Sequence, residues 1–106
     1  MPRRNVIISG DPGAGKTTYA GQIRDPGDVV FDLDKLAAAL GAEFESYDDR
    51  PPDVAALCLG FRDELQRRVM LRQLDRRAIV IVANQFTAHT LALNFDAKHI
   101  HLDGLA

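Results

Sequence analysis

The stretch that decides the fold runs Gly10-Asp11-Pro12-Gly13-Ala14-Gly15-Lys16-Thr17, and it satisfies the pattern G-x-x-x-x-G-K-[ST] at every fixed position. A short β-branched run at residues 6–9 precedes it and has the length of a buried strand. Residues 16–23 can form a helix that ends before the breaker Asp25-Pro26-Gly27. Because this strand–loop–helix order is the setting in which the pattern binds phosphate, the sequence favours a phosphate-binding loop over an ordinary glycine-rich turn.

Each part of this loop has a physical role in binding a nucleoside triphosphate. Glycines let backbone amides approach phosphate oxygens closely, and the positive end of the following helix favours negative charge. We expect Lys16 to reach the β and γ phosphates of ATP or GTP, the Thr17 hydroxyl to bind Mg²⁺, and Thr18 to add a phosphate contact. The predicted nucleotide-binding residues are Gly10, Asp11, Pro12, Gly13, Ala14, Gly15, Lys16, Thr17 and Thr18.

Strand and helix patterns alternate along the rest of the chain. We expect strands at residues 29–31, 78–83 and 98–102, and helices at residues 34–40, 54 to about 77, and 87–95. Residues 78–83 are continuously apolar, which is typical of a central parallel strand, and residues 98–102 are expected at the sheet margin. The alternation predicts an α/β fold of the P-loop NTPase type, with a parallel sheet of about four strands and helices on both faces.

Composition bounds the classes of function. The 106 residues fit one domain, 1–106, with 46% hydrophobic residues and a formal net charge of −2. This charge provides no general basic surface for nucleic acid or anionic membranes. A single cysteine, Cys58, excludes an internal disulfide, and no long apolar run predicts membrane insertion. The cytoplasm is therefore the expected compartment.

Acidic residues follow the second predicted strand. Ligands of such sheets bind beyond the carboxyl ends of the strands, which here are Gly10, Asp32 and Asn84. Asp34 is the predicted general base that accepts a proton from an attacking hydroxyl, or else it caps a helix that begins at Lys35. Asp32 either orients metal-bound water or faces solvent at the strand end. The predicted catalytic residues are Lys16, Asp32 and Asp34.

Three segments together resemble the polynucleotide kinase and zeta-toxin branch of the P-loop kinases. They are the loop at residues 10–18, the strand-end acids of Val30-Phe31-Asp32-Leu33-Asp34, and the polar turn at residues 83–89. This branch includes small kinase-like ATP-binding proteins common in phage genomes. The resemblance spans residues 4 to about 103, and its specific motifs lie in the first 35. It implies transfer of the γ phosphate of ATP to a hydroxyl of a nucleotide, a nucleic-acid end or a small molecule, with Asp34 receiving the hydroxyl proton.

The chain also departs from that branch. Ala83 stands where the branch often carries an acid, and the sequence ends at Ala106, whereas such kinases continue into an arginine-bearing lid. The missing positive charge is expected either from Arg50, Arg67 or Arg68, each of which can equally be a solvated residue, or from a neighbouring copy or protein partner. The alternative is a catalytically inactive nucleotide-binding or partner-regulating module derived from a shortened kinase.

Two histidines mark the last predicted strand. His99, His101 and Asp103 alternate, so they share one face of the strand. This spacing fits either a metal site or the polar surface of an edge strand, and the edge-strand reading is favoured.

Overall fold

A computed structural model describes residues 4–11, 13–40 and 51–103 of the chain. Along the chain it contains β1 (Val6–Gly10), α1 (Lys16–Ile23), β2 (Val29–Phe31), α2 (Leu33–Ala39), α3 (Pro52–Met70), β3 (Ala78–Val82), α4 (Gln85–Asn94) and β4 (Lys98–Leu102). The expected alternation of strands and helices is confirmed, and most bounds agree to within two residues.

The four strands form one parallel sheet in the order β2-β3-β1-β4. β1 pairs with β3 from Val6↔Ile79 to Ser9↔Val82, and its other edge pairs with β4 up to Gly10↔Leu102. Every residue of β1 and β3 is buried, which explains their continuous apolar runs. The predicted central position of residues 78–82 and the marginal position of residues 98–102 are therefore confirmed.

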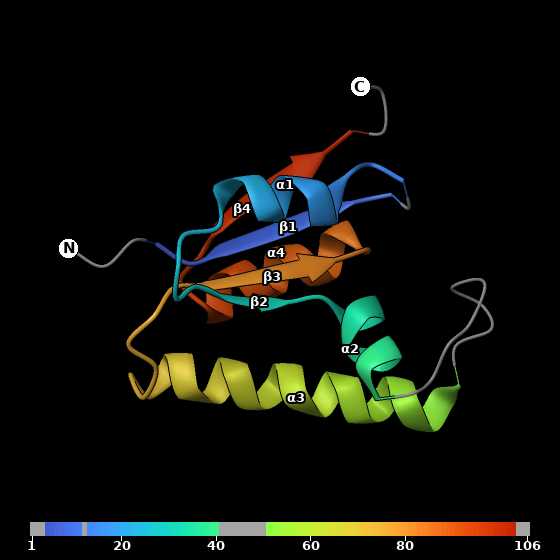
Figure 1. Cartoon of the computed structure of the whole chain (residues 1–106). Helices are drawn as coiled ribbons and strands as arrows, with labels where there is room; N and C mark the ends of the chain where they lie inside the picture. The colour runs from blue at the N-terminus through green and yellow to red at the C-terminus, as the bar shows by residue number, and fades with distance from the viewer. Residues whose placement is uncertain (1–3, 12, 41–50, 104–106) are drawn as a thin grey trace.

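Helices cover both faces of the sheet, as the sequence predicts (Figure 1). α1 packs Ala20, with Tyr19 and Ile23, on the face that carries Ile8 and Ile79. The opposite face is covered by α4, whose apolar residues pack against strand residues that alternate with the first set. This second core contains Ile7, Phe31, Ala78, Val80, Val82, Ala88, Leu91, Ala92, Phe95 and Ala97, and Leu36 of α2 and Leu65 and Val69 of α3 pack against it.

The long helix α3 ends earlier than its sequence pattern suggests. The sequence predicts a helix to about residue 77, but α3 ends at Met70. Arg72 takes a left-handed conformation with φ of 57°, its N–H donates to the Val69 carbonyl at 3.1 Å, and the Gln73 N–H donates to the Arg68 carbonyl at 2.8 Å. These two bonds form a Schellman motif, which closes a helix usually at a glycine. Because arginine occupies the left-handed position here, composition gives no indication of the stop.

Only part of the apolar residues that recur at helical spacing in α3 are buried. Cys58 is fully buried, and Leu65 and Val69 pack against the core. Leu57 and Phe61, which recur at the same spacing, are 54% and 49% exposed. α3 packs against the short helix α2 and meets the sheet-side core only near its carboxyl end, so these side chains remain at the rim of the contact.

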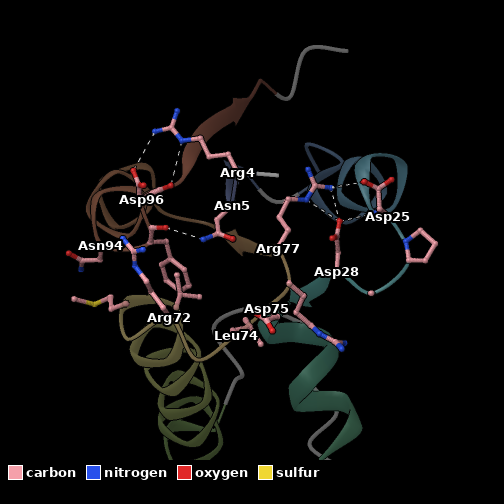
Figure 2. Close-up of a pocket in the computed structure, with 16 residues that line it drawn as sticks. Arg4, Asn5, Asp25, Asp28, Arg72, Leu74, Asp75, Arg77, Asn94 and Asp96 are labelled. Carbon is pink, nitrogen blue, oxygen red and sulfur yellow. Dashed lines mark hydrogen bonds and ion pairs between the residues drawn. The ribbon is translucent and has the colours of Figure 1, made fainter. Parts of the chain in front are cut away.

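Polar side chains tie the strands together at the amino edge of the sheet (Figure 2). The Asn5 amide donates to the Phe95 carbonyl at 3.1 Å and accepts from the Ala78 N–H at 2.9 Å. Arg77 donates to Asp28 Oδ2 at 2.7 Å, and the two side chains are only 8% and 9% exposed. Figure 2 shows these groups around a cavity, which lies at the edge of the sheet opposite to the glycine-rich loop. The cavity is thus lined by groups that hold the fold together.

Candidate functional site

The glycine-rich loop leaves the sheet at the carboxyl end of β1. The Ala14 N–H donates to the Asp11 carbonyl at 3.0 Å, which forms a tight turn. Gly15 is the N-cap of α1 and has φ of 88°, a left-handed conformation that glycine adopts without strain. Pro12, one of the predicted binding residues, lies outside the described residues.

Gly10 lies where the loop and the edge strand β4 come closest. A Cβ at this position would lie 2.8 Å from the carbonyl oxygen of Leu102 and 3.2 Å from the Cβ of Ala14. No side chain fits there without a shift of the backbone. The first glycine of the motif therefore serves packing between β1, β4 and the loop.

The amino end of α1 differs from that of the other described helices. Asp32 caps α2, Asp53 lies in the first turn of α3, and Asn84 caps α4, whereas the described part of α1 has neither a side-chain cap nor an acid in its first turn. It carries Lys16 at its first position instead, although a cation there opposes the helix dipole. The first-turn N–H groups also lack acceptors within the helix. This combination suits a bound anion.

Lys16 lies folded over the loop. Its ammonium donates to the carbonyl oxygen of Gly10 at 2.6 Å and to that of Asp11 at 3.0 Å. The positive charge of Lys16 is therefore held at the first residues of the loop, next to the amino end of α1, which has no acidic side chain in its first turn.

Thr17 and Asp32 are in contact, although the strands that precede them, β1 and β2, are not neighbours in the sheet. The Thr17 hydroxyl donates to Asp32 Oδ2 at 2.7 Å. β1 connects to β2 across the intervening strand β3, so α1 lies over both β1 and β3 and its first turn comes close to the end of β2. Both residues were predicted at the site for separate reasons, and the crossover brings them into contact.

Asp32, and not Asp34, caps α2. Asp32 Oδ1 accepts from the backbone N–H groups of Asp34 at 3.2 Å and Lys35 at 3.4 Å, and the helix begins at Leu33. The alternative that Asp34 caps a helix beginning at Lys35 is therefore wrong, as is a purely solvent-facing Asp32. The chain stays extended up to Asp32, whose side chain then reaches the first-turn donors. Asp34 lies in that first turn, at the carboxyl edge of the sheet.

Thr17 and Asp32 fit a magnesium ion. Mg²⁺ prefers hydroxyl, carboxylate, water and phosphate oxygens, and neighbouring ligands of an octahedral ion with bonds near 2.1 Å lie roughly 3 Å apart. The Thr17–Asp32 oxygen separation of 2.7 Å is close to that spacing. No group of three or more histidine, cysteine or acidic side chains within the described ranges fits a metal, and Mg²⁺ with phosphate ligands does not require one.

The order of the strands changes direction between β1 and β3. These strands are neighbours, and the helices that follow them, α1 and α4, cover opposite faces of the sheet. This is the topological switch point at which ligands bind in α/β sheets. Asn84 follows β3 there, and its side chain caps α4 by accepting from the N–H groups of Phe86 and Thr87.

The predicted arginines of α3 are engaged elsewhere. Arg67 and Arg68 both donate to Glu64, at 2.7 and 2.8 Å, on the outer side of the helix. These hydrogen bonds lower the pKa of Glu64 to about 2. Arg50 lies outside the described residues.

Arg62 of α3 was not among the predicted site residues. It lies one helical turn after the buried Cys58, its Nε is buried without a hydrogen-bond partner among the described residues, and burial lowers its pKa. The four-residue spacing from Cys58 is the pattern that could have placed it on the inward side.

No protein-family model matches the chain, and no curated protein matches it. Among the described residues, no helix is both long enough and apolar enough to cross a membrane.

We expect Gly10→Ala to destabilise the fold, because the added methyl group overlaps the Leu102 carbonyl. Such overpacking lowers the free energy of unfolding by roughly 1–3 kcal/mol. Gly60→Ala in α3 is the matched control, since a Cβ there meets nothing within 4 Å and alanine favours the helix by up to about 1 kcal/mol. Urea unfolding of both variants measures the difference, and equal stability would contradict the close approach.

If Asp32 stabilises the fold by capping α2, its replacement by alanine and by asparagine should have different effects on stability. Asp32→Ala removes the acceptor for two N–H groups and should lower the free energy of unfolding by about 1 kcal/mol, whereas Asp32→Asn keeps a good cap and should change it by a few tenths. Thermal unfolding checks this. If the asparagine variant is as unstable as the alanine variant, then capping is not what Asp32 contributes.

Proposed function

We propose that this chain is a kinase-like P-loop protein that binds ATP or GTP with Mg²⁺ and transfers the γ phosphate to a hydroxyl group. The observation that supports it most directly is the amino end of α1, which lacks an acid and a side-chain cap yet carries Lys16. The Thr17–Asp32 contact adds oxygen ligands beside it. Both features follow from the glycine-rich motif and its position at the switch point.

The residues divide the chemistry among them. Loop amides and Lys16 hold the β and γ phosphates, and Thr17 and Asp32 would hold Mg²⁺, which would supply positive charge to stabilise the phosphates. The acceptor oxygen forms a bond to the γ phosphorus while the bond from that phosphorus to the β–γ bridging oxygen breaks. The hydroxyl proton passes to the carboxylate of Asp34, and a nucleoside diphosphate leaves.

The second candidate function is a nucleotide-binding module without turnover. It is favoured by the engagement of Arg67 and Arg68 with Glu64, because phosphoryl transfer needs additional positive charge at the transferred group. In the catalytic proposal this charge comes from a neighbouring copy of the chain or a protein partner. In the alternative it is not supplied, and binding alone is the function.

Lys16→Ala should weaken nucleotide binding by about 10-fold or more, because charge-assisted hydrogen bonds to phosphate are lost. Calorimetric titration with ATP and with GTP, each with and without Mg²⁺, measures this. Lys98→Ala is the matched control, since Lys98 is exposed at the amino end of β4. A folded wild-type protein that binds neither nucleotide in a magnesium-dependent manner overturns both candidate functions.

Asp34→Asn should leave nucleotide affinity nearly unchanged and lower phosphate transfer by about 100-fold or more, because the proton acceptor is lost. Transfer is measured with γ-labelled ATP and a panel of nucleosides, oligonucleotides and small alcohols. Asp63→Asn on α3 is the control for loss of one negative charge. Binding without transfer in the wild type would select the non-catalytic function, and transfer that persists in Asp34→Asn would exclude Asp34 as the base.

A further inference from the structure

A serine and two histidines form a hydrogen-bonded group directly before the loop. Ser9 of β1 is fully buried, and its Oγ lies 2.7 Å from His99 Nε2 and 2.9 Å from His101 Nδ1 of β4. The register between β1 and β4 pairs Ser9 with His101, so all three side chains share the α4 side of the sheet. Both histidines lie on the edge strand β4, as the favoured interpretation predicts, and both also point toward the buried hydroxyl of Ser9.

The protonation state of this group is restricted by its hydrogen bonds. A serine hydroxyl has one proton to donate and can accept as well. It therefore donates to one imidazole and accepts from the other, which requires an unprotonated nitrogen on at least one ring. When both rings are doubly protonated, the hydroxyl proton has no acceptor among the three groups, and two positive charges face each other.

Two neighbouring histidines on the α4 side of the sheet affect the protonation of His99. His89 of α4 and His101 disfavour a charge on His99, and burial lowers the pKa of His99 below its ordinary value more than either neighbour does. Asp103 Oδ1 lies 3.9 Å from His101 Nε2. Lys98 belongs to the opposite face by strand alternation.

The same segment of β4 touches the first residue of the loop. Leu102 follows His101, and its carbonyl oxygen allows no side chain at Gly10, which follows Ser9. The two strands are therefore held together at the Ser9 group and are in close contact one residue later. A change in the separation of β1 and β4 at Ser9 would shift Gly10 relative to α1.

We infer that Ser9, His99 and His101 form a proton-linked positioning group that holds β4 against the start of the loop, so that nucleotide binding weakens as the pH falls. The inference rests on the proposed nucleotide site. His99 bears the effect, because its neutral form is the one the fold favours. The folded state thus binds fewer protons than the unfolded state just below pH 6.5, so stability decreases as the pH falls through that range. Loop order decreases at lower pH, where His99 of the folded protein itself takes up a proton.

The test compares the wild type with His99→Gln, whose amide retains a hydrogen bond to Ser9 but does not titrate. The first measurement is the amide NMR shift of Gly10 between pH 7.5 and 5.5 without nucleotide. We expect it to titrate in the wild type and to stay nearly constant in His99→Gln. His89→Gln, which removes an exposed imidazole of α4, should still titrate.

The second measurement is magnesium–ATP and magnesium–GTP affinity at the same two pH values. The wild type should lose about 5-fold more affinity than His99→Gln on acidification, a typical size for coupled sites. Titration of the nucleotide phosphates is common to both proteins and cancels in the comparison. Equal losses, or a Gly10 shift that does not titrate, overturn the inference. Absence of nucleotide binding at every pH counts against the proposed function, whereas the Gly10 titration still decides whether the group is linked to the loop.

Discussion

β1, like its neighbour β3, is hydrogen-bonded on both edges and buried on both faces, so its chain leaves the sheet only at the end of the strand. Its backbone groups are paired until Gly10, so the loop must begin at the carboxyl edge of the sheet. β3 lies beside it and ends at the same edge, and the two following helices turn to opposite faces. The topological switch point between β1 and β3 is a consequence of this arrangement and does not depend on what the loop binds.

Some features of the candidate site do not stabilise the fold by themselves. Lys16 lies at the positive end of a helix, and the described residues supply that end with no acid. Asp32 partly offsets this through two roles, since one carboxylate oxygen caps α2 and the other accepts from Thr17. The Asp32 side chain thus connects the amino ends of α1 and α2. It contacts both the Thr17 hydroxyl and the Asp34 backbone N–H.

The order of helices and strands could be predicted from the sequence, but the contacts between their side chains could not. Buried apolar runs and the motif identify β1, β3 and α1 because period and length are local properties. The choice between Asp32 and Asp34 as the cap was not predictable, since both types of residue cap well and only the point where the extended chain ends decides. Because side chains alternate along a strand, His99 and His101 were predicted on one face of β4. Which face of the sheet this is depends on the register between β4 and β1, and these strands are far apart in the chain.

The position of β1 also bears on how the protein is made. Its partners are β3 and β4, which follow it in the chain at residues 78–82 and 98–102. Val6, Ile7 and Ile8 cannot enter the sheet until residues 78–102 have been translated. The nascent chain therefore carries the apolar residues 6–8 without their sheet partners while the residues between β1 and β3 are being made.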